Sequence, residues 1–463
     1  MHSATSPTTA TTRFLGEIWR GVHGDAAWLE HIAVAGAGHL PAVFPVTGLA
    51  TAAVGAAALA IAELIHQACG LAPHVQVDQR LASLWFGTSL RPQGWELPPQ
   101  WDPVAGDYRA KDGWIRLHTN APHHRDTALA VLGLAAQADK AAVAQAVSEW
   151  DAGALEAAIV ENGGCAAAMR TVAEWATHPQ GIAVNSEPLM HWATTTGGPR
   201  PAWAIAPDRP LRGIRVLDLT RILAGPVATR FLAGFGADVL RIDPPGWEEP
   251  GTVPEVVLGK RCARLDLKSA ADRQVLERLL SQADVMVHGY RPEALARLGL
   301  DARRRREINP ALVDVSLDAY GWSGPWKGRR GFDSLVQMST GIADAGMRAA
   351  GLDRPKPLPV QAIDHATGYL MATAAIRGLT QRLATGAGCE VRASLARTAH
   401  LLVAGAQGEA SPFPPEAPAD LAETMEATGW GPARRLRPPA TVQGAPMLWD
   451  RPADRLGASL AQW

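Results

Sequence analysis

Asp364 stands where a proline-spaced, extended segment gives way to an apolar helix, in the stretch PLPVQAIDHATGYLMATAAIRGLTQRL (357–383). An aspartate at such a point is a preferred N-cap residue, which stabilises a helix by about 1 kcal/mol. The same carboxylate also suits nucleophilic catalysis, since it forms a covalent acyl intermediate. With a reference pKa of about 3.9 it would be ionised at neutral pH without special tuning. Its neighbour His365 fits a packing or partner role better than that of a base. This window alone leaves both roles of Asp364 open.

Other reactive side chains form no clear metal site. HTNAPHHRD holds three histidines but does not complete a zinc-ligand set, so a surface loop is favoured over a metal site. The four cysteines are far apart and form no C-x-x-C pair, which is typical of a reduced cytoplasmic protein. We therefore expect no metal. These residues are His118, His123, His124, Cys69, Cys165, Cys262 and Cys389.

Composition sets the remaining limits. The chain of 463 residues is 47% hydrophobic and 19% charged, which suits two or three domains with a sizeable core. Lys and Arg (44) nearly balance Asp and Glu (45), and no long basic run appears, so no nucleic-acid partner is expected. The start of the chain lacks a signal-like pattern. Residues 42–65 carry no charge before Glu63 and are long enough to span a bilayer, but their Ala and Gly content favours a buried helix, so no membrane partner is expected.

Three regions follow one another along the chain. Residues 1–205 are Ala-rich and helical with a short strand at 112–120, and "APDRP" (206–210) is typical of a linker. Residues 211–405 alternate strands with helices. Residues 406–463 are rich in Pro and Gly and are expected to wrap over a surface without much regular structure.

The middle region has the clearest pattern. Short apolar runs predict strands at 213–220, 238–243, 284–290 and 311–321, and helical spacing predicts a helix at 272–283. Strands separated by helices imply right-handed crossovers. The expected fold class is therefore α/β: a Rossmann-like, doubly wound parallel sheet, with a smaller α+β domain.

An internal repeat accompanies this pattern. VTGLATAAVGAAALAIAEL (46–64) resembles ATGYLMATAAIRGLTQRL (366–383), and a strand-like segment follows each copy. In this alignment Phe44 matches Asp364. Only one copy is therefore expected to use a carboxylate.

The middle region resembles the class III CoA-transferases, the family that includes formyl-CoA transferase, carnitine CoA-transferase and 2-methylacyl-CoA racemase. The resemblance is carried by GIRVLDLTRILAGPVATRFLAGFGADVLRIDPPG, GKRCARLDLKS, ADVMVHGYRPEALARLGL, NPALVDVSLDAYGWSGPW, RRGFDSLVQMSTGI and AIDHATGYLMATAAIRGLTQRLATGAG, in family order. DGWIRLHTN and CAAAMRTVAEWATHPQGIAV resemble later family segments. The chain order is thus that of a permuted or half-duplicated subunit, in which 46–200 should pack against 211–400.

The resemblance implies the chemistry. Asp364 would be the nucleophile of a CoA-transferase, carrying first an acyl group and then CoA. Acyl-CoA and a small carboxylic acid would be the substrates, with no permanently bound cofactor. A cytoplasmic homodimer is the default by resemblance. The implied CoA contacts, with Lys268 and Arg297 the preferred phosphate partners, are Leu223, Ala224, Leu265, Lys268, Gly289, Tyr290, Arg291, Arg297 and Arg330.

Departures from the family narrow the function. Racemases carry GHD where this chain has GFD, and Phe332 cannot exchange a proton, so racemisation is not expected. No glycine-rich loop like that of formyl-CoA transferase is found, which disfavours formate and oxalate. Two alternatives stay open. One is a catalytically degenerate paralogue that binds acyl-CoA. The other is an NAD-type oxidoreductase in which Asp243 would bind the ribose, although Gly-x-Gly-x-x-Gly is absent.

Overall fold

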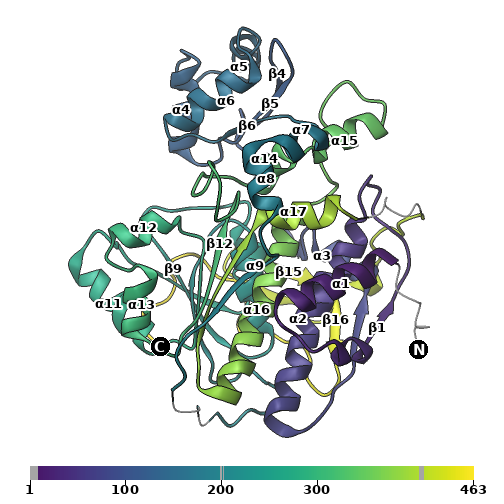
Figure 1. Ribbon diagram of the computed structural model, residues 1–463, viewed down its shortest axis with the longest axis vertical. Helices are drawn as coiled ribbons and strands as arrows, with labels where there is room; N and C mark the ends of the chain where they lie inside the picture. The colour runs from purple at the N-terminus through teal and green to yellow at the C-terminus, as the bar shows by residue number, and fades with distance from the viewer. Residues whose placement is uncertain (1–8, 199–200, 202, 406–410) are drawn as a thin grey trace.

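The computed structural model describes all residues except 1–8, 199–200, 202 and 406–410. The beginnings of the first and third predicted regions therefore lie outside the described residues. Figure 1 shows a small lobe, containing β4–β6 and α4–α6, above a larger body that contains the central sheet and the long helices α2 and α16.

The central sheet joins the middle region to one strand of the N-terminal region. Within the described residues it has seven strands in the order β10-β9-β8-β11-β12-β13-β7. All neighbours are parallel except β7, which pairs antiparallel with β13 at the edge. The strands are β8 (Arg215–Leu219), β9 (Asp238–Asp243), β10 (Lys260–Arg264), β11 (Val285–His288), β12 (Val313–Asp318), β13 (Cys389–Ser394) and β7 (His191–Thr194).

Helices cover both faces of this sheet because successive strand residues point to opposite sides. Val216 belongs to the large core that holds α2, α9 and α16, whereas Leu217 belongs to a second core with α11. This arrangement confirms the predicted fold class. The helices of the region are α9 (Ala224–Gly234), α10 (Val253–Val256), α11 (Ala270–Ser281), α12 (Pro292–Arg297), α13 (Ala302–Ile308), α14 (Asp333–Ser339), α15 (Ile342–Ala349), α16 (Ala362–Thr385) and α17 (Leu395–Val403).

The small lobe has a sheet and a core of its own. The sheet order is β4-β5-β6, and the core contains Tyr108, Ile115, Val143 and Leu155. β5 lies within the predicted strand 112–120. The elements are β4 (Gly106–Arg109), β5 (Trp114–Leu117), β6 (Ala166–Ala168), α4 (Pro122–Val131), α5 (Lys140–Val147) and α6 (Ala152–Glu161), followed by α7 (Val172–Thr177) and α8 (Pro179–Asn185).

The C-terminal region has more regular structure than predicted. β16 pairs with β2, and β15 pairs with β3, so two small sheets join the two ends of the chain. The strands are short, and a Pro-rich composition does not reveal an edge strand whose partner is far away in sequence. The elements are η2 (Pro418–Asp420), β14 (Glu426–Thr428), β15 (Gly431–Arg435), β16 (Ala440–Val442) and β3 (Leu90–Pro92). The last residues do wrap over the surface: the Trp463 indole donates to the Leu279 carbonyl.

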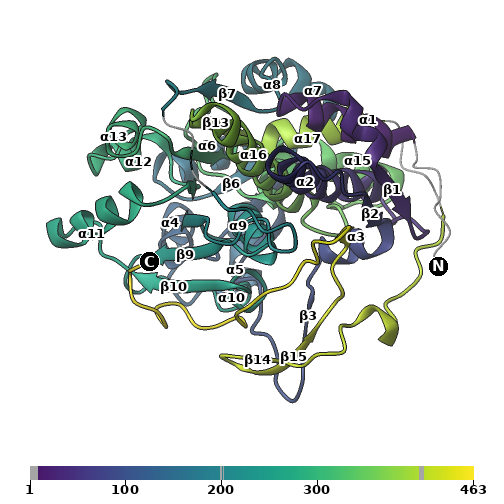
Figure 2. The ribbon, with the colours of Figure 1, turned by 90° about the horizontal axis from the view of Figure 1, so that it is seen from below.

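The apolar segment near the N-terminus is a core helix of this fold. α2 (Val46–Cys69) is long and apolar enough to cross a membrane, but its most apolar window is wholly buried in protein. It lies against α16, as Figure 2 shows. The prediction of a buried helix is confirmed. Its neighbours are α1 (Thr9–Gly21), η1 (Ala26–His31), β1 (Ile32–Ala35), β2 (Val75–Asp78) and α3 (Gln79–Trp85).

One ion pair ties α2 to α16 inside this core. The Glu63 carboxylate of α2 pairs with the Arg377 guanidinium of α16, and both side chains are largely buried. Glu63→Ala leaves the largely buried arginine charge without its carboxylate, so we expect the free energy of unfolding to fall by about 3 kcal/mol. Chemical denaturation measures this. Glu307→Ala, which breaks the exposed pair with Arg303, is the control and should cost under about 1 kcal/mol. Equal losses would contradict the buried pairing.

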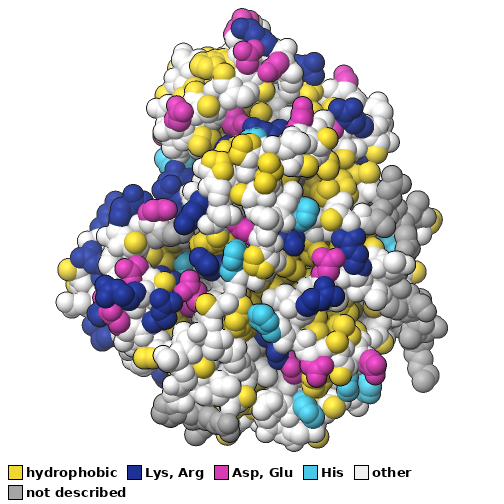
Figure 3. Space-filling model, viewed as in Figure 1, with side chains coloured by type: hydrophobic (Ala, Val, Ile, Leu, Met, Phe, Trp, Pro, Cys, Tyr) yellow, Lys and Arg dark blue, Asp and Glu magenta, His cyan; other side chains and the backbone are white. Residues whose placement is uncertain are grey.

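A charged face lies over α11–α13, where Lys and Arg side chains gather in Figure 3. Several of these arginines are matched by glutamates: Arg304 pairs with Glu277 and Arg306 with Glu390. Such a surface is a solvated face with mixed charges.

Candidate active site

Asp364 lies in the first turn of α16 and is 5% exposed. It does not cap its own helix. The backbone N–H groups of Ile363 and Asp364 both donate to Oδ2 of Asp333, at 2.9 and 3.0 Å. Asp333 is the first residue of α14, so the N-terminus of α16 is capped from another element. The Asp364 carboxyl forms no hydrogen bond with any described residue.

Asp333 is itself held in place. Gln337, one turn later on α14, donates its amide to Asp333 Oδ1, and its Oε1 accepts the N–H of Leu358 at 2.8 Å. The segment that leads into α16 is therefore fixed at two points to α14.

Both carboxyls have raised pKa values, chiefly because both are buried. Burial, and then the nearby Asp333 charge, raise the pKa of Asp364 well above its usual value. Burial raises the pKa of Asp333 to about 6, although the N–H donors of Asp364, Gln337 and Ile363 oppose the shift. The sequence-based expectation that Asp364 needs no tuning to be ionised is therefore wrong, because a buried carboxyl loses its hydration beside a second acid.

These carboxyls line a cavity of about 1140 Å³. It opens at the carboxyl ends of β8 and β11, between which the strand order reverses, and this is where doubly wound sheets bind ligands. The loop Thr220–Gly225 forms one wall, and residues 289–291 after β11 form another.

Six of the nine predicted CoA contacts line this cavity: Leu223, Ala224, Gly289, Tyr290, Arg291 and Arg330. Leu265, Lys268 and Arg297 are not among its lining residues. The Leu265 side chain is 6% exposed and belongs to the core beneath α11, whereas Lys268 and Arg297 are exposed on the surface. The structure thus brings the first six together and leaves the last three apart.

Three arginines at the cavity lack a carboxylate partner among the described residues: Arg221, Arg291 and Arg330. Arg221 donates to the Tyr290 hydroxyl at 2.6 Å and stacks on Trp247, and Arg330 donates to the Gly163 carbonyl. By contrast, Arg329, in the same wall, pairs with Glu156. Arg221 was missed by sequence reasoning, although it lies only two residues after the end of β8. Unneutralised guanidinium groups suit phosphate oxygens.

The loop after β8 is held in an unusual conformation. Ile222 has φ +65°, a region that β-branched residues rarely adopt, and its N–H donates to Glu249 Oε1. Glu249 also pairs with Arg241, which holds Asp243. The backbone N–H groups of Ala224 and Gly225, which follow, form no hydrogen bond with any described residue. Backbone conformations of this kind cluster at functional sites, so this turn is a candidate part of one.

The same network argues against a dinucleotide site. Asp243 is 1% exposed and both of its carboxyl oxygens accept from Arg241, so it is not available to a ribose. The NAD-type alternative is therefore not favoured.

Much of the opposite wall comes from the N-terminal region. Phe86, Arg116 and His118 line the cavity, and the His118 ring stacks on Phe332 with 3.7 Å between centroids. Residues 112–120 thus contribute to the cleft of the 211–400 sheet. His118 and His124 are buried, so the interpretation of their segment as a surface loop is wrong for them. No cluster of metal-ligating groups is found within the described residues.

His365 belongs to this wall rather than to the chemistry. Its ring stacks on Phe86 with 5.2 Å between centroids, and burial lowers its pKa to about 3. A neutral, buried imidazole of this kind packs and shapes the cavity, in keeping with the predicted packing role.

Comparison with known proteins assigns the region that contains the cavity's sheet to a family. The model of "CoA-transferase family III" matches residues 211–420, which include Asp364 and the loop after β8. Residues 211–420 belong to CoA-transferase family III. This assignment confirms the family expected from the sequence. The order in which the family III segments occur along the chain stays a prediction.

Several curated proteins are similar to the family III region. An acetyl-coenzyme A transferase of Hypoxylon pulicicidum is 33% identical over 46% of this chain and 36% of its own length. A probable fatty acyl-CoA transferase of Mycobacterium tuberculosis is 34% identical over 39% of this chain and 49% of its own. Human succinyl-CoA:glutarate CoA-transferase is 31% identical over 43% and 49%. The chain thus spans half or less of these three relatives. A crystal structure of the M. tuberculosis protein Rv3272 gives a TM-score of 0.39, at 32% identity, over 42% of this chain and 57% of that one.

Proposed function

We propose that this protein is an acyl-CoA:carboxylate CoA-transferase in which Asp364 is the covalent carrier. One observation carries the proposal: among the described residues, a buried carboxyl without a hydrogen-bond partner lines the same cavity as three arginines without carboxylate partners. A nucleophile and an anion-binding surface therefore share one space. The family III match and the names of the relatives support CoA transfer in general.

The proposed first half-reaction moves CoA onto the enzyme. An Asp364 carboxylate oxygen attacks the acyl-CoA carbonyl, and the C–S bond breaks to release CoA thiolate and leave a mixed anhydride. The thiolate then attacks the aspartyl carbonyl. The product acid leaves with one oxygen from Asp364, and an aspartyl-CoA thioester remains.

The second half-reaction repeats these steps with the second acid. Its carboxylate attacks the aspartyl thioester, which gives a new anhydride and CoA thiolate. The thiolate attacks the acyl carbonyl, and the Asp364 carboxylate leaves with one oxygen of the incoming acid. No oxidant, reductant or net proton is needed.

Other groups at the cavity support these steps. The amides of Ile363 and Asp364 already donate to Asp333, so they are not available to a developing oxyanion. The N–H groups of Ala224 and Gly225, at the start of α9, are better placed for a negative oxygen. Arg221, Arg291 and Arg330 suit the phosphates of CoA.

Trapping tests this function. The full chain is incubated with acetyl-CoA, succinyl-CoA or a longer acyl-CoA, then treated with hydroxylamine or borohydride and digested. We expect a hydroxamate or a reduced side chain at Asp364, in the 357–383 peptide, by mass spectrometry. The Asp364→Asn variant is the control and should carry no adduct. An unlabelled peptide with every donor would favour a degenerate acyl-CoA-binding protein.

A further inference from the structure

The internal repeat is more extensive in space than in sequence. α2 and α16 each have 24 residues, and both end at a left-handed glycine, Gly70 and Gly386. The residues that precede the two helices, Pro45 and Gln361, have nearly the same backbone torsions: φ −76°, ψ 66° and φ −76°, ψ 64°. Aligning these ends places Gly48, not Phe44, opposite Asp364. The sequence alignment is therefore wrong by one helical turn, because an Ala- and Gly-rich helix matches itself after a shift of four residues.

The repeat continues beyond the helices. β2 and β13 follow, and then α3 and α17, whose N-caps Asp78 and Ser394 both accept from backbone N–H groups. β2 pairs in parallel with β1 as β13 does with β12. The chain thus contains two related units, one built on α2 and the other on α16.

Each unit takes its outer strand from the segment that follows the other unit. β7, which comes after the first unit and the small lobe, pairs antiparallel with β13 of the second. β16, which comes after the second unit, pairs antiparallel with β2 of the first. α2 and α16 lie side by side between the central sheet and the small sheet β1-β2-β16 (Figure 2). This is a reciprocal exchange within one chain, so the two units cannot separate without unpairing strands.

Only one of the two equivalent positions faces open space. Asp364 lines the cavity. At Gly48, a Cβ atom would stand 3.4 Å from the Ala10 Cβ of α1 and 3.4 Å from the Thr11 hydroxyl. α1 therefore fills the space where a second site would lie. The first unit instead gives Phe86, Gly87 and Thr88, just after α3, to the wall of the Asp364 cavity.

We propose that a single chain is the complete catalytic unit, with one acyl-carrying site, and that the α2 unit takes the place of a second copy. The proposal rests on the proposed function for the chemistry, but not for the architecture. A dimer, if one forms, is not needed to complete the cavity, since both of its walls come from one chain.

Native mass spectrometry of the full chain tests this, with transfer assayed across a wide dilution series. We expect monomers that each bind one CoA. Each chain should carry one acyl adduct, confined to the 357–383 peptide. The rate of transfer per chain should not change on dilution. Transfer per chain that is lost as dimers dissociate on dilution, or two CoA molecules per chain, would overturn the proposal.

The two proposals fail in different ways. If no adduct forms with any donor, the catalytic assignment fails, yet the mass of the resting protein and the number of bound CoA molecules still decide the architecture. If adducts form at Asp364 only in dimers, the single-chain unit fails while the chemistry survives. An adduct within residues 1–205 would contradict the single site directly.

Discussion

Asp364→Asn is expected to lower CoA transfer by about 10³-fold or more, the scale seen when a nucleophile is removed. Asparagine has nearly the same size and shape, but its amide cannot displace CoA thiolate to form an anhydride. CoA binding should survive, because Arg221, Arg291 and Arg330 are untouched. Steady-state assays and equilibrium binding of CoA measure the two effects separately. Undiminished turnover would reject Asp364 as the carrier.

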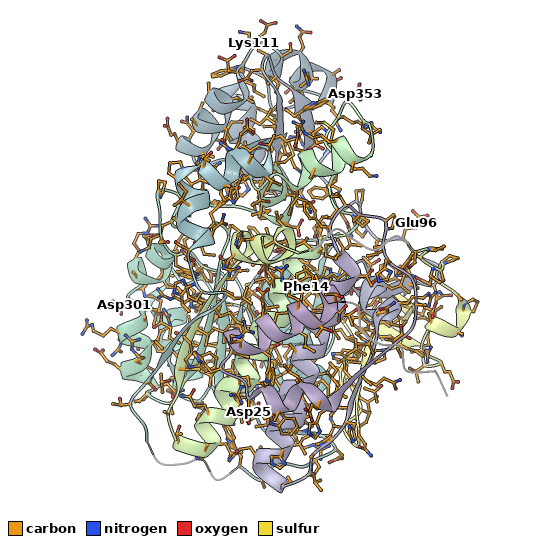
Figure 4. The ribbon with its side chains drawn as sticks, turned by 45° about the vertical axis from the view of Figure 1, so that its right-hand side comes forward. Phe14, Asp25, Glu96, Lys111, Asp301 and Asp353 are labelled. Carbon is orange, nitrogen blue, oxygen red and sulfur yellow. The ribbon has the colours of Figure 1, made fainter. Side chains whose placement is uncertain are left out.

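The matched control is Asp353→Asn, on the exposed loop after α15 (Figure 4), which should leave transfer unchanged. The stability of Asp364→Asn gives a second readout.

The pKa of Asp364 is higher in the folded protein than in the unfolded chain. Its contribution to stability is therefore fully present below the unfolded pKa of about 3.9 and is lost as the pH rises through the folded pKa. Asparagine does not incur this loss. The variant should therefore melt no lower than the wild type at neutral pH.

Asp333→Asn is expected to lower transfer by about 10²-fold, the cost of misplacing a reacting group by about 1 Å. Asp333 uses both oxygens, one for the amides of α16 and the other for Gln337, and asparagine has only one oxygen. The pH profile should move as well. The nucleophile must be ionised, so kcat/KM rises with pH through the pKa of Asp364. Removing the neighbouring charge lowers that pKa, and the rise moves to lower pH.

Asp318→Asn serves as the control for this profile. Asp318 ends β12 in the same cavity, and burial raises its pKa to about 7, although the Tyr320 and Gly321 amides oppose the shift. It is therefore a second buried carboxyl of the cavity with a raised pKa. We expect the pH at which kcat/KM rises to shift in Asp333→Asn and not in Asp318→Asn. The opposite result would contradict the coupling between Asp333 and Asp364.

The sequence predicted those parts of the fold that depend on local pattern. The strands at 213–220, 238–243 and 284–290 are β8, β9 and β11, because buried parallel strands are short apolar runs. The family resemblance added Asp364 as the expected nucleophile, and Leu223 and Ala224 in the loop after the first strand as expected CoA contacts. Leu223 and Ala224 line the same cavity as Asp364.

Other features depend on contacts that no local pattern contains. Asp333 lies 31 residues before Asp364, and its capping role depends on how α14 meets α16. The raised pKa values of Asp333 and Asp364 depend on the same packing, because it buries both carboxyls. The motif resemblance implies that Lys268 is a phosphate partner, yet Lys268 does not line the cavity. The one-turn error at Phe44 has a different cause, since a helix of small residues carries too little sequence information to fix its own alignment.

Labelled oxygen tests the central claim most directly. The full chain is incubated with an acyl-CoA and an acceptor acid whose carboxyl oxygens are ¹⁸O. After many turnovers, mass spectrometry with fragmentation measures the ¹⁸O content of the 357–383 peptide. If Asp364 carries the group as an anhydride, its carboxyl must acquire ¹⁸O from the acid, while the same peptide from Asp333→Asn should label more slowly. Transfer that proceeds with Asp364 unlabelled would show that CoA passes between the acids without this carboxyl.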